Sequence, residues 1–375
     1  MSKLPNISTS IFAVMSKLAH EQGAINLSQG FPNFPEDERL LRISEQLIRQ
    51  NIHQYTPMAG LPLLMDKIAQ QTYTRYNRKV NTNTEMLITA GATQGIYSTI
   101  NALIKNSDEV IILDPSYDSY EPSVAMAGGI SVRVPLNPDY TPNFNTIEEA
   151  ITSKTKMIII NNPHNPTGRI WTVADFEALE TILDKHPQIL VLGDEVYEYI
   201  TFTQPHISFH TRKKLKNRTI IASSFGKSLH VTGWKVGYLI ASETIMHEIK
   251  KVHQFLVFSV NSFSQHAIAA YLDVVDFEEV SKMYLEKRNL FKNLLKESRF
   301  ELMPCDGTYF QVVSYQNISK TNDVDFAKEL IQKHGVAAIP ISVFYNDQTD
   351  RQMLRFCFAK TDETLIQAAE KLVKI

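Results

Sequence analysis

Several side chains capable of ligand chemistry follow directly after short apolar runs. Asp194 follows the run 189–193, and a carboxylate at the end of a buried strand is unfavourable unless it is paired. A cationic ring nitrogen would be a suitable partner, and Tyr197 would point a phenol to the same place if a helical turn begins here. A helix N-cap is the alternative role for Asp194. Lys227 follows the run 219–223 in a loop of small residues, a position that suits a Schiff-base lysine, and an ordinary surface lysine is the alternative.

An anion site is predicted where the segment 89–95 opens a helix. Its small residues, Ala92 and Thr93 among them, would expose backbone N–H groups, although a tight turn without a ligand has the same composition. The Gly-x-Gly-x-x-Gly spacing of a dinucleotide site is absent. A P-loop around Lys227 is rejected, because Ile221 stands where the first Walker glycine is needed. Lys235 is a second cation that could bind phosphate and lower the pKa of Lys227.

Two further groups follow neighbouring strands. Tyr117 could stack on a planar ligand or pack under its own loop, and Asn165 could offer an amide to a ligand or stabilise its turn. Taken together, the groups comprise a phosphate cradle, a stacking ring, an amide, a carboxylate, a phenol, a lysine and a second cation. One small molecule uses all of them, namely pyridoxal phosphate, and no metal is expected.

These groups require a sheet that brings strand ends together. From about residue 85, β-branched runs alternate with helix-like segments such as 94–106, which predicts a mostly parallel sheet covered by helices on both faces. Ligands of such sheets bind at the carboxyl ends of the strands. The strands are expected at 85–89, 109–113, 157–161, 189–193 and 219–223, and a helix with a capping box is expected from Thr172.

The last third of the chain has a different pattern. A long helix is expected at 277–296, followed by short strands at 307–313, 337–339 and 354–358. We expect a smaller α+β unit here, with the N-terminal segment packed on it. The predicted division is a large cofactor-binding domain at 41–284 and a small domain made of 1–40 and 285–375.

Composition excludes several classes of protein. Lys and Arg number 38 and Asp and Glu number 40, which argues against a nucleic-acid or anionic-membrane partner. Hydrophobic residues make up 43% of the 375 residues, which is ordinary for a globular protein and excludes global disorder. No apolar run reaches the length of a membrane span. Two cysteines are too few for a disulfide framework, so a cytoplasmic protein is expected.

The motifs that carry these groups resemble a known family over essentially the whole chain. The chain is similar to the class I aminotransferases of pyridoxal-phosphate fold type I, an α/β fold with a three-layer αβα domain and a smaller α+β domain. Within this family it resembles the kynurenine aminotransferase and glutamine transaminase branch, and bacterial methionine aminotransferases most of all. The family resemblance lies in Asn165-Pro-Thr-Gly168, Asp194-Glu-Val-Tyr197, Ser223-Ser-Phe-Gly-Lys-Ser228, Gly233-Trp-Lys-Val-Gly-Tyr238 and Leu354-Arg-Phe-Cys-Phe358. The likeness to the branch lies in Asn26-Leu-Ser-Gln-Gly-Phe-Pro-Asn-Phe34 and Gln54-Tyr-Thr56. The likeness to methionine aminotransferases lies in Asp114-Pro-Ser-Tyr-Asp-Ser-Tyr120, His253-Gln254 and Ala337-Ala-Ile-Pro-Ile-Ser-Val-Phe344.

The resemblance implies roles for individual residues. Lys227 would hold the cofactor and move the substrate α-proton, and Asp194 would pair with the ring nitrogen. The phenolic oxygen of the ring would be bound by Asn165 and Tyr197, and its face would be covered by Tyr117. The phosphate would be held by Ala92, Thr93, Ser224 and Lys235, and by Tyr55 of the partner in a homodimer with shared active sites. The substrate would be held by Arg355, Asn165, the Gly30 backbone and Phe12.

Two departures from relatives bear on this assignment. Lys235 stands where aspartate aminotransferases have Arg, and lysine lacks the bidentate fork for phosphate. Thr93 stands where relatives carry a larger side chain, which leaves the shape of the pocket open. The implied reaction is ping-pong transamination, with methionine and aromatic donors such as phenylalanine and tyrosine first, and glutamine and kynurenine next. The alternatives are a cysteine-S-conjugate β-lyase with the same residues and a non-catalytic regulator on the same fold.

Overall fold

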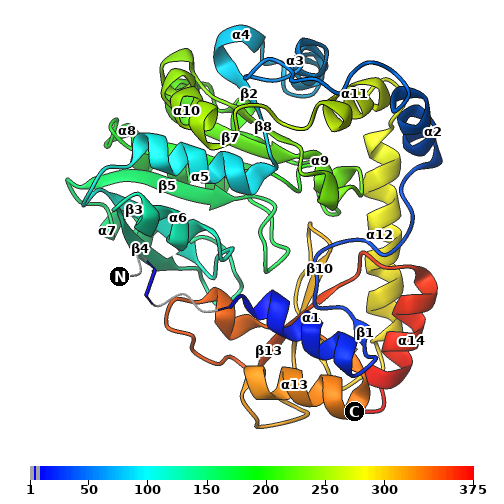
Figure 1. Cartoon of the computed structure of the whole chain (residues 1–375). Coiled ribbons are helices and arrows are strands. Elements are labelled where there is room, and N and C mark those ends of the chain that lie inside the picture. The colour runs from blue at the N-terminus through cyan, green and yellow to red at the C-terminus, as the bar shows by residue number, and fades with distance from the viewer. Residues whose placement is uncertain (1–3, 6–8) are drawn as a thin grey trace.

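A seven-stranded sheet forms the centre of the larger part of the molecule (Figure 1). The structure is a computed structural model that describes residues 4–5 and 9–375. The strand order is β2-β8-β7-β6-β5-β3-β4. The strands are β2 (Met86–Thr89), β3 (Glu109–Asp114), β4 (Ile130–Pro135), β5 (Thr155–Asn161), β6 (Leu190–Asp194), β7 (Thr219–Ser224) and β8 (Gly237–Ile240).

Most of this sheet is parallel, as the sequence predicts. The pairs β3–β4, β3–β5, β5–β6 and β6–β7 are parallel, and β8 runs antiparallel to both β2 and β7. The strand β8 is not among the predicted strands, because it is only four residues long and lies in a glycine-containing motif. The ends of β5, β6 and β7 lie side by side, so that Asn161 pairs with Asp194 and Asp194 pairs with Ala222.

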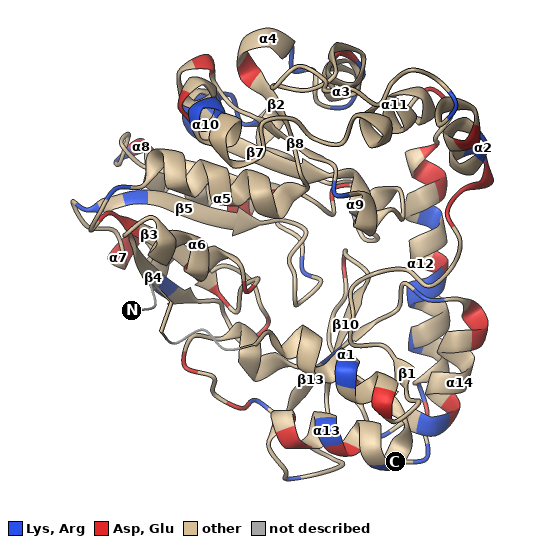
Figure 2. Ribbon diagram, in the orientation of Figure 1, with Lys and Arg blue, Asp and Glu red and all other residues tan. Residues whose placement is uncertain are grey.

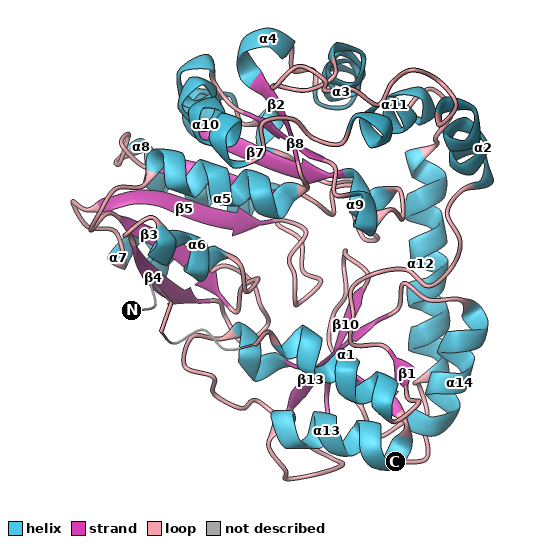
Figure 3. Cartoon of the chain, in the orientation of Figure 1, coloured by secondary structure: helices cyan, strands magenta, loops and turns pink. Residues whose placement is uncertain are grey.

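Helices cover both faces of the sheet, which explains why its strands are apolar on both sides (Figure 3). On one face, Ile112 and Leu192 share a core with helices α5 and α10; on the other, Ile111 and Val191 pack with α8. The capping box predicted at Thr172 is confirmed at the start of α8. The helices of this part are α2 (Glu38–Leu47), α3 (Pro62–Tyr76), α4 (Thr82–Glu85), α5 (Ala92–Leu103), α6 (Tyr120–Met126), α7 (Phe144–Glu149), α8 (Val173–Asp184), α9 (Phe225–Ser228), α10 (Glu243–Leu256) and α11 (Ser262–Tyr271).

A smaller α+β unit contains most of the C-terminal residues and the first described helix (Figure 1). Its antiparallel sheet has the order β12-β13-β10-β9, and β1 pairs in parallel with β11. The strands are β1 (Ile25–Asn26), β9 (Glu301–Leu302), β10 (Phe310–Ser314), β11 (Val336–Ala337), β12 (Ile339–Pro340) and β13 (Met353–Cys357). The helices are α1 (Ile11–Glu21), α13 (Asp323–His334) and α14 (Asp362–Leu372).

The long helix α12 (Phe277–Leu294) runs between the two parts of the molecule (Figure 1). It crosses residue 284, where the sequence places a domain boundary. The pairing of β1 with β11 and the packing of α1 on α13 join the N-terminal segment to the C-terminal unit, as the proposed division into 41–284 and 1–40 with 285–375 requires, but α2 and α12 cross its boundaries. Residues 1–3 and 6–8 of the proposed small domain lie outside the described residues.

The surface carries both signs of charge. Acidic and basic side chains both occur along α12 and α10 (Figure 2), in line with the near-equal totals of 38 and 40. Among the described residues, no helix combines the length and the apolar character that a membrane span requires.

Candidate active site

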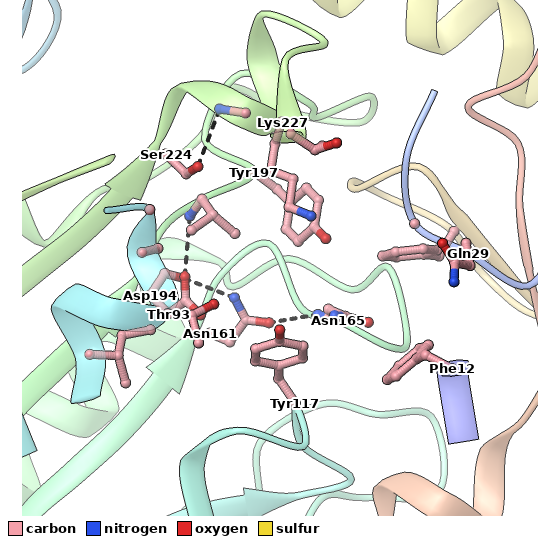
Figure 4. Close-up of a pocket in the computed structure, with 18 of the residues that line it drawn as sticks. Phe12, Gln29, Thr93, Tyr117, Asn161, Asn165, Asp194, Tyr197, Ser224 and Lys227 are labelled. Carbon is pink, nitrogen blue, oxygen red and sulfur yellow. Dashed lines mark hydrogen bonds between the residues drawn. The ribbon is translucent and has the colours of Figure 1, made fainter. Parts of the chain in front are cut away.

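A cavity of about 350 Å³ lies at the carboxyl ends of the strands and is bounded on its other side by the small unit. Twelve of the thirteen predicted site residues line it. Figure 4 shows several of them pointing into the same space. The twelve are Phe12, Gly30, Ala92, Thr93, Tyr117, Asn165, Asp194, Tyr197, Ser224, Lys227, Lys235 and Arg355. The thirteenth, Tyr55, is 82% exposed in the single chain and does not line the cavity.

Asp194 is a buried carboxylate with an internal partner that the sequence did not identify. The hydroxyl of Tyr120 donates to Asp194 Oδ2 at 2.5 Å, and the backbone N–H of Val196 makes a longer contact of 3.4 Å to Oδ1. Burial raises the pKa of Asp194 to about 6, against the opposing effect of the Tyr120 hydrogen bond. The side chain of Asp194 therefore lines the cavity and is held in place by Tyr120, rather than acting as a helix N-cap.

Lys227 lies in α9, a short helix that begins directly after β7. Its first turn is capped by Ser224, whose hydroxyl oxygen accepts from the backbone N–H of Gly226 at 3.2 Å (Figure 4). Lys227 Nζ lies 5.8 Å from the ring centres of Tyr197 and Tyr309. Burial, together with the nearby charge of Lys235, lowers the pKa of Lys227 to about 8. The amine is therefore much closer to its neutral, nucleophilic form at physiological pH than a surface lysine.

The segment predicted to bind an anion forms the start of α5. This helix begins at Ala92, and among the described residues no side chain caps its first N–H groups. Its N-cap, Gly91, has φ 77°, and a Cβ at Gly91 would lie 3.1 Å from Lys235 Nζ. The ammonium group of Lys235 thus lies beside free helix N–H groups. Gly237 of β8 allows this close approach, because a Cβ there would lie 2.9 Å from the nitrogen of Ala92.

Arg355 reaches the cavity from β13 of the small unit. Its Nη1 donates to Asn165 Oδ1 at 2.5 Å, and its guanidinium lies 3.8 Å from the ring centre of Phe310. The backbone of Asn165 is fixed in turn, since its N–H donates to Asn161 Oδ1 at 2.7 Å. Burial lowers the pKa of Arg355 to about 10, so it still carries its charge, and its Nε has no partner among the residues that the structure describes. A carboxylate is the ligand that such a guanidinium accepts best.

The chain also matches a known protein family over most of its length. Residues 22–372 match the family described as aminotransferase class I and II. The chain belongs to the class I and II aminotransferases. Its fold is that of the fold type I members, and the resemblance inferred from its motifs is confirmed.

Individual aminotransferases are similar over nearly their whole length. A methionine aminotransferase of Escherichia coli is 44% identical over 99% of this chain and 97% of its own. A solved structure described as an Escherichia coli methionine aminotransferase superposes with a TM-score of 0.97, covering 100% of this chain and 99% of that one. A kynurenine–oxoglutarate transaminase of Dictyostelium discoideum is 31% identical over 98% of this chain and 94% of its own.

The site of this aminotransferase also contains residues that sequence reasoning missed. Gln29, Asn161, Thr232 and Phe310 line the cavity, and Tyr120 supports it from outside. Asn161 ends a predicted strand and could have been found by the rule that led to Asp194. Tyr120 gave no such signal, because its contact with Asp194 depends on the strand order.

Proposed function

We propose that this aminotransferase uses pyridoxal phosphate to move the α-amino group of an apolar or aromatic amino acid to a 2-oxo acid, with methionine as the preferred donor. One observation carries the proposal: Lys227, Asp194 and Arg355 lie in one cavity, beside free helix N–H groups and Lys235. When bound, the cofactor supplies an aldehyde and a conjugated ring that withdraws electrons.

The residues present fit this cofactor. The N–H groups of Ala92 and Thr93, with Ser224 and Lys235, suit a phosphate. Asp194 suits a cationic ring nitrogen, because a buried carboxylate needs a positive partner. Tyr197 and Asn165 suit a phenolic oxygen, and Tyr117 suits the face of a flat ring. Figure 4 labels Thr93, Tyr117, Asn165, Asp194, Tyr197 and Ser224 of this set.

Lys227 performs both the attachment and the proton transfer in this proposal. Its neutral amine would hold the cofactor through the aldehyde, and with a substrate in the site the same amine would be placed to take the proton from the substrate Cα. A base with a pKa of about 8 is well matched to that task near neutral pH. Asp194 holds a proton on the ring nitrogen, and Tyr197 donates its hydroxyl hydrogen to the phenolic oxygen, since burial raises its pKa and keeps it protonated.

The cations of the cavity determine the donor. Within the part of the chain that the structure describes, its lining contains three, namely Lys227, Lys235 and Arg355. The first is assigned to the aldehyde, the second to the phosphate and the third to the substrate α-carboxylate. A side-chain carboxylate would have no cation left and would cost several kcal/mol to bury. Phe12 and Phe310 instead offer apolar surface, against which a methionine or aromatic side chain gains roughly 1.5–3 kcal/mol.

Donor kinetics test this proposal. kcat/KM is measured for methionine, phenylalanine, kynurenine and aspartate with one oxo-acid acceptor, and the aminated acceptor and any ammonia are both quantified. We expect apolar donors to exceed aspartate by at least about tenfold, because each 1.4 kcal/mol or so is a factor of ten. Aspartate as the best donor would overturn the assignment of the pocket. With S-phenylcysteine as an additional substrate, release of thiophenol, pyruvate and ammonia in place of amino transfer would indicate a β-lyase.

A homodimer that completes the site is part of the proposal. Tyr55 is exposed and lies with its ring 5.4 Å from that of Phe258, in an edge contact. Phe255 is 87% exposed on the adjoining end of α10. Exposed aromatic rings at one place are characteristic of a surface that another molecule covers. We assign the second molecule as another copy of this chain, whose phosphate site receives Tyr55.

A further inference from the structure

Tyr120 lies just outside the cavity and holds one oxygen of Asp194. It is the first residue of α6 and is 2% exposed. Its hydroxyl donates to Asp194 Oδ2 at 2.5 Å, which is short for a bond between neutral groups and typical of a bond to a carboxylate. Within the described part of the chain, Asp194 Oδ1 has only the 3.4 Å contact from Val196 N–H. The carboxylate is therefore fixed through one oxygen and leaves the other for a ligand.

The ring of Tyr120 makes a second contact that concerns the same ligand position. It meets the ring of Tyr117 edge to face, with 5.7 Å between centres and an angle of 77°. Tyr117 and Asp194 both line the cavity, whereas Tyr120 does not. One buried residue thus supports the ring that would lie on the cofactor face and the carboxylate that would meet its edge.

We propose that Tyr120 is a positioning residue, which holds Asp194 as an oriented carboxylate for the cationic ring nitrogen of the cofactor. The proposal rests on the proposed function. In this proposal, the hydroxyl of Tyr120 affects cofactor binding only through the ring nitrogen of the cofactor. If the hydroxyl only stabilised the fold, its removal would weaken every cofactor equally.

A substitution combined with a change in the ligand separates these two roles. Tyr120→Phe removes the hydroxyl and keeps the ring packing. Tyr315→Phe is the matched control, because Tyr315 is fully buried in the small unit and its hydroxyl donates to a single acceptor, the carbonyl of Thr321, at 2.8 Å. The ligands are pyridoxal phosphate and an analogue with carbon in place of the ring nitrogen. Dissociation constants are measured by titrating the cofactor-free protein and following absorbance.

Tyr120→Phe is expected to weaken binding of pyridoxal phosphate by about tenfold or more, the effect of losing a hydrogen bond to a charged group. For the carbon analogue the loss should be less than about threefold, since only minor packing changes remain. Tyr315→Phe should change neither constant, although both variants should lower the melting temperature of the cofactor-free protein.

Two outcomes would overturn the inference. The first is an equal loss for both ligands in Tyr120→Phe, and the second is no loss for either. If the wild-type protein did not bind pyridoxal phosphate covalently, the proposed function would fail together with this inference. If it bound and Tyr120→Phe bound equally well, only the role of Tyr120 would be lost.

Discussion

The protonation of Lys227 determines how fast the protein can capture an aldehyde. Only the neutral amine attacks, and its pKa is lowered to about 8 by burial and by Lys235. Below this pKa the neutral fraction falls about tenfold per pH unit. We therefore expect the rate constant for covalent attachment of pyridoxal phosphate to the cofactor-free protein to rise up to about pH 8 and then level off. Stopped-flow absorbance between pH 6 and 9 measures it.

A flat profile over this range would contradict that prediction. Lys227→Ala serves as the control, because it should bind pyridoxal phosphate without covalent attachment and should have no measurable turnover. Borohydride reduction followed by mass measurement distinguishes attached from merely bound cofactor.

The guanidinium of Arg355 should be needed for donor affinity. Arg355→Lys keeps a charge but gives up the fork that can bind Asn165 and a carboxylate together. We expect KM for methionine to rise by about ten- to a hundredfold, because a hydrogen bond between charged groups is lost. Arg351→Lys is the control, since Arg351 lies over the ring of Tyr345 and does not line the cavity. Equal KM values in the two variants would remove Arg355 from this role.

Single residues were predictable where their type was unusual for their position. A carboxylate after a buried run and a lysine in a small-residue loop were found from the sequence, and the structure places both in the cavity. Tyr120 was not found, because Asp194 is 74 residues away in β6, and only the strand order β6-β5-β3 brings the end of β6 near the segment that follows β3. Tyr55 was assigned only from the family likeness, and the single chain does not place it in a site.

At the scale of elements, the short strand β8 determines how closely the phosphate cradle approaches the sheet. A Cβ on Gly237 would lie 2.6 Å from Ser223 O and 2.9 Å from Ala92 N. We expect Gly237→Ala to destabilise the protein by about 1–3 kcal/mol, as overpacking does, and to weaken cofactor binding. Thermal unfolding and cofactor titration measure both effects.

The same motif provides a control for this prediction. A Cβ on Gly233 would meet nothing within 4 Å. Gly233→Ala should therefore retain cofactor affinity. If the two variants behaved alike, the close packing at Gly237 would not be what shapes the cradle.

Helices and strands were predictable where the hydrophobic pattern and the capping residues indicated the same element. The buried runs of β3, β5 and β7 and the capping box of α8 were recognised within a residue or two. The predicted helix at 94–106 is α5, which begins two residues earlier and ends three residues earlier. The antiparallel direction of β8 was not predictable, because a four-residue strand with glycine at its start gives little periodic signal and its direction depends on long-range pairing.

At the scale of the whole molecule, the proposed dimer predicts that two defective chains can restore one site. A mixed dimer contains one chain with Lys227→Ala and one with Tyr55→Ala. One of its sites then combines an intact Lys227 with an intact Tyr55 from the other chain. We expect this dimer, isolated with two different tags, to show about half of the wild-type activity, since one of two symmetric sites is intact.

Each parent homodimer sets the reference for that measurement. Lys227→Ala should be inactive, and Tyr55→Ala should lose roughly tenfold in cofactor affinity. Activity in the mixed dimer no greater than half of that of the Tyr55→Ala parent would show that Tyr55 acts within its own chain. Light scattering that found a fully active monomer would rule out the shared site.

The pairing of β1 with β11 has a consequence for the order in which the protein is made. It pairs Ile25 with Val336, so a strand near the start of the chain cannot form this pairing until a strand near the end has been synthesised. The cradle, Asp194 and Lys227 all lie in the earlier-synthesised part, whereas Arg355 emerges among the last residues. On the ribosome, the residues of this chain that are proposed to hold the cofactor are therefore synthesised before Arg355, the residue proposed to bind the substrate carboxylate.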